Sequence, residues 1–254
     1  MLESGTGVLI TGGARRIGRA IALDLAAHGF AVVIHHNESG EEAEALASVI
    51  NRDGGFARVV QADLTDPTAA ASLVDKAVEA VGRIGIVVNN ASIFEDDSVT
   101  DFTLDRFDRH FALHLKAPLQ IAQAFARYAG GDMDALIVNM IDQRVWRPNP
   151  RFFTYTLSKA ALWMATKTMA QALAPNIRVN AIGPGPTLAN DRQSPEDFQR
   201  QIRGLLLQRG PELPEFGATI RYLWETPSIT GQMIALDGGQ HLAWETPDIA
   251  GIAE

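Results

Sequence analysis

Three residues in the second half of the chain have types and a spacing suited to proton transfer. Tyr155 and Lys159 are four residues apart, so on a helix they share one face, and the lysine ammonium can lower the pKa of the phenol from about 10 toward neutral pH. Asp142 precedes the tyrosine by thirteen residues. A carboxylate can orient or recharge such a proton donor. We therefore interpret Tyr155, Lys159 and Asp142 as candidate catalytic residues.

The composition excludes several other kinds of chemistry. The absence of cysteine excludes disulfides, thiolate chemistry and cysteine-ligated zinc, and the six histidines are scattered, so we expect no metal site. The net charge of −8 has the wrong sign for a protein that neutralises nucleic-acid phosphates. No apolar run reaches the roughly 18 residues of a membrane span, and the chain does not start like a signal peptide. We expect no nucleic-acid or membrane partner and a cytoplasmic location.

Short β-branched or apolar runs alternate with longer segments of helical period along the chain. This alternation is typical of βαβ units, in which helices cover both faces of a parallel sheet. No linker or repeat interrupts it, so we predict one doubly wound α/β domain over residues 1–254 with a seven-stranded sheet. The expected strands are Val8–Ile10, Ala31–His35, Ala57–Gln61, Ile84–Asn89, Ala135–Met140, Arg178–Ile182 and Met233–Leu236. The expected helices are about Arg16–His28, Glu41–Asp53, Pro67–Val81, Leu104–Tyr128, Phe153–Leu173 and Pro211–Trp224.

The turn after the first expected strand has the residues of a phosphate-binding loop. The sequence TGGARRIG, Thr11–Gly18, leads from that strand into a helix whose first backbone N–H groups can receive a phosphate. Gly12 permits the tight turn and Gly18 allows close packing, but Arg16 stands where the usual fingerprint has a further glycine. Such a turn can be purely structural. Its place at the first strand of an α/β chain favours dinucleotide binding.

The end of the second expected strand bears on the choice of nicotinamide cofactor. NAD-binding proteins have an acid about 20 residues after the glycines, which holds the ribose 2′-hydroxyl and would repel a 2′-phosphate. This chain has His36 and Asn37 there, and Arg15 and Arg16 can bind a 2′-phosphate. NADP(H) is therefore favoured. The alternative is that both arginines are merely solvated and that Glu38 supplies the acid.

Six motifs occur in order between Thr11 and Gly239, and together they resemble the short-chain dehydrogenase/reductase superfamily. The motifs are TGGARRIG, Asp63 in QADLTD, NNAS at Asn89–Ser92, Tyr155-x-x-x-Lys159, Pro184-Gly185 and Asp237-Gly238-Gly239. The pattern YxxxK alone is common by chance, whereas six ordered motifs are not. The resemblance implies a Rossmann-type domain, hydride transfer between a nicotinamide cofactor and a small-molecule substrate, and a homotetramer or homodimer.

The resemblance also implies roles for individual residues. Tyr155 would be the catalytic acid or base, and Lys159 would bind the nicotinamide ribose and lower the tyrosine pKa. Cofactor contacts would come from Tyr155, Lys159, Thr11, Gly12, Arg15, Arg16, Ile17, Gly18, His36, Asn37, Asp63, Leu64, Asn89, Ala91, Pro184 and Gly185. Structural alternatives stay open, since Asn89 can simply end a strand and Tyr155 can be a core residue with a satisfied hydroxyl.

Two residues depart from the superfamily pattern. Asp142 replaces the serine that polarises the substrate carbonyl, and His114 stands where an asparagine commonly holds a relay water. An ionised carboxylate would repel the oxyanion formed from a ketone, so Asp142 favours reduction of a C=N bond unless it is protonated. We treat His114 as a candidate proton relay, with a buried structural histidine as the alternative.

Arg16, Asp142 and the tyrosine–lysine pair are together similar to the pteridine reductases and bacterial dihydromonapterin reductases of this superfamily. In that subgroup the arginine reaches both the cofactor phosphate and the substrate, and a phenylalanine after NNAS stacks the pterin against the nicotinamide. Phe94 matches that position, although it can equally be core packing. The resemblance thus implies a substrate site of Arg16, Ser92, Phe94, Asp142 and Tyr155.

These features predict an NADPH-dependent oxidoreductase that reduces the C=N bond of a dihydropterin-like substrate, with Tyr155 as proton donor. One alternative is a carbonyl reductase or alcohol dehydrogenase in which Asp142 works protonated. Another is a nucleotide-sensing binding protein without turnover, against which the tyrosine–lysine pair argues. Residues at about 186–210 are expected to form a lid with a short amphipathic helix. The tail at about 240–254 either packs at a subunit interface through Trp244 or is disordered.

Overall fold

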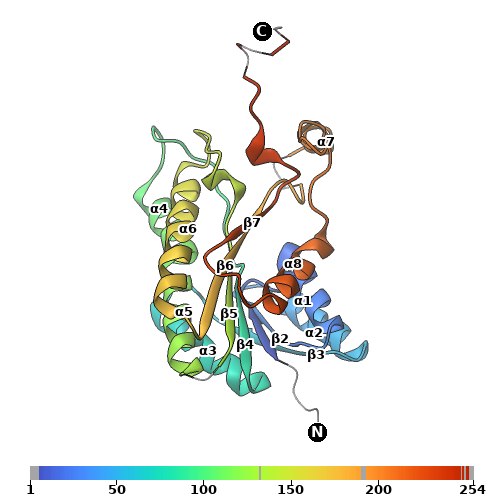
Figure 1. Ribbon diagram of the computed structural model, residues 1–254, viewed down its shortest axis with the longest axis vertical. Coiled ribbons are helices and arrows are strands. Elements are labelled where there is room, and N and C mark those ends of the chain that lie inside the picture. The colour runs from blue at the N-terminus through green and yellow to red at the C-terminus, as the bar shows by residue number, and fades with distance from the viewer. Residues whose placement is uncertain (1–5, 132, 190–192, 247, 249, 252–254) are drawn as a thin grey trace.

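A seven-stranded parallel sheet forms the centre of the molecule (Figure 1). The structure is a computed structural model that describes residues 6–131, 133–189, 193–246, 248, 250 and 251. The strand order is β3-β2-β1-β4-β5-β6-β7, so the chain builds outward from β1 in one direction and, after β3, in the other. The strands are β1 (Gly7–Ile10), β2 (Ala31–His36), β3 (Phe56–Gln61), β4 (Ile84–Asn89), β5 (Ala135–Met140), β6 (Ile177–Pro184) and β7 (Met233–Leu236).

Helices cover both faces of this sheet. One layer contains α1, α2 and α8, and the opposite layer contains α3, α4, α5 and α6, while α7 lies beyond the sheet edge near the end of β7 (Figure 1). The helices are α1 (Arg16–Ala27), α2 (Gly40–Arg52), α3 (Pro67–Val81), α4 (Leu104–Phe111), α5 (Ala117–Ala129), α6 (Phe153–Leu173), α7 (Pro195–Arg203) and α8 (Leu213–Glu225). The predicted doubly wound α/β fold is confirmed.

The two helical layers explain why the strands are apolar along their whole length. Val8 and Ile10 of β1 pack with α1, α2 and α8, whereas Leu9 between them packs with α3 and α5. Successive strand residues point to opposite faces, so a sheet covered on both sides needs apolar side chains at every position. None of the helices in the described part of the chain has the length and hydropathy needed to cross a membrane.

The helix expected over Leu104–Tyr128 is instead α4, a π-helical turn at Ala112–Lys116, and α5. In the turn, the N–H of Ala117 bonds to the carbonyl of Ala112, five residues back. Pro118 follows directly and has no N–H to continue the α-helical pattern, which accounts for the interruption. His114 lies within this turn and is fully buried.

The expected lid and tail are partly described. Helix α7 is the short amphipathic helix expected within 186–210, and residues 190–192 lie outside the described part of the chain. In the tail, Gln240–Leu242 form a 3-10 turn, and Trp244 is exposed on the single chain. Residues 247, 249 and 252–254 lie outside the described residues, so both expectations for the tail stay predictions.

Candidate active site

A cavity of about 640 Å³ lies where six strands end, at the point where the strand order reverses between β1 and β4. Ligands of open α/β sheets bind at such a reversal. Most of the predicted site residues line this cavity, namely Gly12, Arg15, Arg16, Ile17, Gly18, His36, Asn37, Asp63, Leu64, Ala91, Ser92, Phe94, Asp142, Tyr155, Lys159, Pro184 and Gly185. Thr11, Asn89 and His114 are not among the lining residues.

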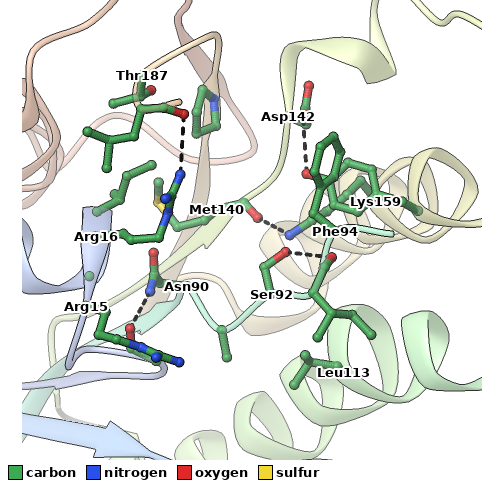
Figure 2. A pocket seen from close by; sticks show the side chains of 18 of the residues that line it. Arg15, Arg16, Asn90, Ser92, Phe94, Leu113, Met140, Asp142, Lys159 and Thr187 are labelled. Carbon is green, nitrogen blue, oxygen red and sulfur yellow. Dashed lines mark hydrogen bonds between the residues drawn. The ribbon is translucent and has the colours of Figure 1, made fainter. Parts of the chain in front are cut away.

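The three candidate catalytic residues meet on one side of the cavity. Helix α6 carries Tyr155 and Lys159 one turn apart, and Asp142 follows the end of β5 (Figure 2). The Tyr155 hydroxyl donates to Asp142 Oδ2 at 3.0 Å. Lys159 Nζ donates to the carbonyl oxygen of Met140 at 2.9 Å and lies 5.7 Å from the centre of the Tyr155 ring. Tyrosine, lysine and aspartate therefore form one connected group.

Burial dominates the acid–base properties of this group. It raises the pKa of Tyr155 well above its ordinary value, and the Asp142 carboxylate adds to the rise because it would repel a phenolate. Burial also raises the pKa of Asp142, although the backbone N–H and guanidinium of Arg144 oppose this. The pKa of Lys159 falls to about 8, again chiefly through burial. The net direction is thus opposite to the one expected from Lys159, because burial and Asp142 together raise the Tyr155 pKa in this structure.

Aromatic rings and one arginine surround the Tyr155 side chain. Phe94 stacks on Phe152 with ring centres 4.0 Å apart. The centres of the Phe94 and Tyr155 rings are 4.8 Å apart, and these two rings are nearly perpendicular. The Arg144 guanidinium lies over both phenylalanine rings, 5.3 Å from Phe94 and 4.8 Å from Phe152. The backbone N–H of Arg144 donates to Asp142 Oδ1 at 2.8 Å. Neither Phe152 nor Arg144 is among the sequence predictions, since no local pattern distinguishes them.

The glycine loop has the close packing that a phosphate-binding turn requires. Gly12 has a φ of +61°, and a Cβ at Gly18 would lie 2.3 Å from the Gly12 carbonyl oxygen. The N–H of Gly12 donates to Nδ1 of His35 at 3.1 Å, so Nε2 of that ring carries the proton and donates to the Ala62 carbonyl at 3.0 Å. Burial lowers the pKa of His35 to about 4. His35, which the sequence indicates only as a strand residue, thus holds the loop as a neutral imidazole.

Thr11 and Asn89, for which we predict cofactor contacts, form hydrogen bonds with protein groups and do not line the cavity. The Thr11 hydroxyl accepts the N–H groups of Asn90 and Ala91 at 2.9 and 3.0 Å. Asn89 is buried within the sheet and donates to Asn139 Oδ1 at 2.8 Å, whereas Asn90 lines the cavity. Adjacent strand residues point to opposite faces, which is why one asparagine of the NNAS motif faces the cavity and the other does not.

The two loop arginines have protein partners. Arg16 donates from Nη1 to the Ala189 carbonyl and from Nη2 to the Leu188 carbonyl, each at 3.3 Å. Arg15 lies 3.6 Å from Glu42, and both of these side chains are largely exposed. Arg15 and Arg16 remain part of the cavity lining. The loop therefore presents its arginines at the cavity edge.

The cavity end beside β2 contains the residues of both cofactor alternatives. His36 and Asn37 line it together with Glu38 and Ser39. Gln61, at the end of the neighbouring strand β3, donates from its side-chain amide to the Asn37 carbonyl at 2.9 Å and so helps to fix this turn. The preference for a 2′-phosphate over a 2′-hydroxyl therefore stays a prediction.

His114 is held on both ring nitrogens by protein groups. Its Nε2 accepts the backbone N–H of Ile93 at 3.1 Å, so Nδ1 carries the proton and donates to Ser158 Oγ at 2.8 Å. Ser158 Oγ in turn donates to the Tyr155 carbonyl at 2.7 Å. Burial lowers the pKa of His114 well below its ordinary value. His114 Nε2 also lies 3.0 Å from the hydroxyl oxygen of Ser92, which lines the cavity, so the proton relay and the buried structural alternative both stay predictions.

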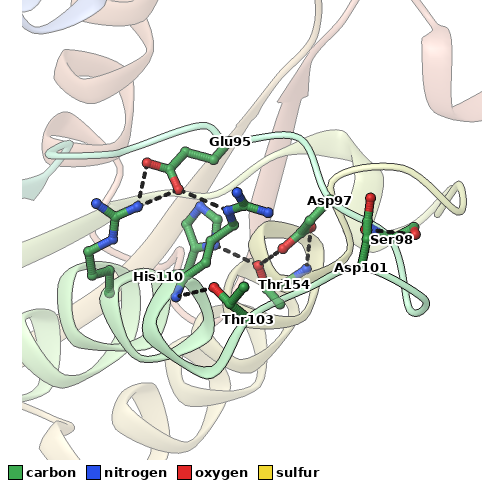
Figure 3. A network of polar contacts seen from close by, with 9 residues as sticks. Glu95, Asp97, Ser98, Asp101, Thr103, His110 and Thr154 are labelled. Atoms are coloured by element: carbon green, nitrogen blue, oxygen red, sulfur yellow. Dashed lines mark hydrogen bonds and ion pairs between the residues drawn. The ribbon is translucent and has the colours of Figure 1, made fainter.

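Asp97 holds the first turn of α6, which carries Tyr155. Phe152 precedes the helix with a φ of +55° and gives it no side-chain cap. Asp97 Oδ1 accepts the N–H of Thr154 at 3.1 Å, and Oδ2 accepts the Thr154 hydroxyl (Figure 3). His110 Nδ1 then donates to the same hydroxyl at 2.8 Å. A carboxylate from a distant loop thus takes the place of the missing cap and favours the positive end of the helix.

Asp97→Asn should destabilise the protein because an amide cannot accept at both positions. We expect a loss of about 1–2 kcal/mol of unfolding free energy, measured by urea denaturation. Asp101→Asn is the matched control, since Asp101 lies in the same loop but is exposed. Equal effects of the two substitutions would contradict the capping role.

The pKa of His35 predicts a pH dependence of stability. Between pH of about 6.5 and 4 the unfolded chain binds a proton at this histidine and the folded protein does not, so acid favours unfolding. The contribution should reach about 2 kcal/mol by a pH of roughly 4.5. His35→Asn retains an acceptor and a donor but does not titrate. The wild type should therefore lose stability more steeply than this variant, and parallel curves would refute the assignment.

Comparison with known proteins agrees with this geometry. The model of the short chain dehydrogenase family matches residues 6–199, and the chain belongs to this family of oxidoreductases. Dihydromonapterin reductase of Escherichia coli is 28% identical over 237 residues, covering 92% of this chain and 96% of the relative. The crystal structure of FolM alternative dihydrofolate reductase 1 from Brucella suis, in complex with NADP, is 61% identical with a TM-score of 0.94, covering 96% of this chain and 98% of that one.

A short chain dehydrogenase of Burkholderia cenocepacia, also in complex with NADP, is 34% identical with a TM-score of 0.86, and covers 94% of this chain and 99% of that one. These likenesses confirm the predicted family and its resemblance to the pteridine-reducing members.

Proposed function

We propose that this protein is an NADP(H)-dependent reductase that transfers hydride to the C=N bond of a dihydropterin-like substrate. The observation that carries the proposal is the Tyr155 hydroxyl bonded to Asp142 within the cavity, where most of the family has a serine. Two similar proteins support the substrate class, because dihydromonapterin and dihydrofolate, which name them, are both pteridines.

The cavity residues fit a dinucleotide. Gly12 and Gly18 leave no room for a side chain, so the backbone can approach a pyrophosphate at the N-terminus of α1. Arg15, His36 and Asn37 would hold the 2′-phosphate, and Asp63 and Leu64 the adenine. Lys159, Ala91, Pro184 and Gly185 also line the cavity and would hold the nicotinamide riboside. When bound, the nicotinamide supplies the hydride. Crystal structures of the Brucella and Burkholderia relatives contain NADP.

A flat heterocycle fits the remaining part of the cavity. Phe94 offers an aromatic surface beside Tyr155, and Ser92 and Arg16 add polar groups at its edge. Polar groups at defined places around an aromatic surface are what a nitrogen-rich ring requires. The substrate site would thus comprise Arg16, Ser92, Phe94, Asp142 and Tyr155.

Proton delivery follows from the connected group. Tyr155 holds a proton on Oη and passes it to the substrate nitrogen, and the phenolate left behind takes a proton from Asp142. Asp142 accepts the Tyr155 hydroxyl in its ionised resting form and relays this proton from solvent, because its side chain is about 17% exposed. The Lys159 ammonium favours the transient phenolate. No oxyanion has to form on the substrate beside a carboxylate, in contrast to ketone reduction.

The deciding experiment follows NADPH absorbance with dihydrobiopterin, dihydromonapterin, dihydrofolate and simple ketones. We expect pteridine turnover, and Asp142→Ser should lower kcat/KM for pteridines at least about tenfold relative to ketones. An unchanged ratio would argue for the carbonyl-reductase alternative, and NADPH binding without any turnover for the sensor. Fluorescence titration should show a Kd for NADPH at least about tenfold below that for NADH. Equal values would remove the 2′-phosphate assignment.

Tyr155→Phe tests the proton donor directly. Removing the hydroxyl should reduce turnover at least about a hundredfold while NADPH binding is retained, since a general acid contributes on that scale. Tyr128→Phe is the control, because that hydroxyl lies away from the cavity and accepts the Ile84 N–H. Near-normal turnover in Tyr155→Phe would exclude this residue from the mechanism. Assembly as a homodimer or homotetramer and a cytoplasmic location accompany this proposal as untested expectations.

A further inference from the structure

A second cavity of about 430 Å³ adjoins the one described above. Phe94, Arg144, Gln193 and Gln201 line both cavities, so the two lie side by side at these side chains. The second cavity is completed by Asp96, Arg151, Phe152 and Asp197. Its volume is within the usual range of small-molecule sites, roughly 300–1,000 Å³, so it can hold a substantial part of a ligand.

Arg144 has a buried donor at the junction of the two cavities. Its guanidinium is fixed over the stacked rings of Phe94 and Phe152, and its Nη1 has no hydrogen-bond partner among the described residues. The side chain is about 17% exposed, and its Nε lies 3.9 Å from Asp142 Oδ1. Nη1 itself has almost no accessible surface, but the Arg144 side chain is partly exposed and lines both cavities, so a ligand oxygen beside its guanidinium would give this under-bonded cation an acceptor.

The acidic residues of the second cavity are already paired. Asp96 lies 2.5 Å from an Arg151 nitrogen, and Asp197 lies 3.1 Å from Arg200. A ligand oxygen entering this space therefore meets no isolated carboxylate in the described part of the lining. The stacked phenylalanine pair beside Arg144 offers a planar, apolar surface to a conjugated group.

We propose that the second cavity is a subsite for a large pteridine substituent whose carbonyl or carboxylate oxygen accepts a hydrogen bond from the Arg144 guanidinium. The inference rests on the proposed function: with the ring beside Phe94 in the first cavity, its substituent continues past that side chain. An aromatic amide matches both the ring surface and the unmet donor, whereas a short hydroxyalkyl chain matches neither. Dihydropteridines with an aminobenzoyl-type extension are thus the preferred substrates.

The test compares two substrates in one variant. In the presence of NADP, Arg144→Met should raise the Kd for dihydrofolate about tenfold or more and the Kd for dihydrobiopterin less than about threefold. Methionine retains the packing on the rings and removes the donor. Any effect that acts through Asp142 alters both substrates alike and cancels in the ratio. Arg200→Met is the matched control, because Arg200 is exposed on α7 and outside both cavities.

A second measurement uses the wild-type protein. The fragment p-aminobenzoylglutamate should compete with dihydrofolate for the NADP-bound protein, and this competition should be lost in Arg144→Met. Equal weakening of both substrates, or no weakening of either, would overturn the subsite, as would absence of fragment competition. If no pteridine is turned over, the proposed function fails, while fragment titration of the wild type and the variant still decides whether the subsite exists.

Discussion

The hydrogen bond from the Tyr155 hydroxyl to the Asp142 carboxylate is the interaction around which the site is arranged. Both groups are withdrawn from water, and burial makes each hold its proton more tightly than it would in solution. Burying such a polar pair costs folding free energy unless neighbouring groups complete its hydrogen bonds. The Arg144 backbone does so at the second carboxylate oxygen, and the Met140 carbonyl orients the Lys159 ammonium. The position of the proton donor therefore depends on these neighbouring hydrogen bonds as well as on its own hydroxyl.

Further supports come from the segment between β4 and α5. Asp97 closes the open end of α6, and His114 in the π-helical turn joins Ile93 to Ser158 on the same helix. The π-helical turn places the buried His114 ring between Ile93 and α6, whereas a regular helix would direct this side chain elsewhere. Tyr155 is thus positioned in part by residues that lie more than 40 positions away in the sequence.

Local pattern and ordered motifs were sufficient for the fold, and most of the site residues predicted from them line the cavity. Strands β4, β5 and β7 and helices α3 and α6 begin and end at the residues expected from hydrophobic period, because that signal is local. Asn89 and Asn90 could not be separated, since a shift of one residue at a strand end reverses the face. The capping role of Asp97 could not be predicted from local sequence, because Thr154, whose N–H it accepts, is 57 residues away. The direction of the Tyr155 pKa depends on burial, which spacing does not reveal.

Arg16 connects parts of the chain that are more than 170 residues apart, through the carbonyls of Leu188 and Ala189. The Arg16 side chain therefore links the glycine loop to the segment that leads toward α7. Removing the Arg16 guanidinium would therefore free the glycine loop and this segment from each other.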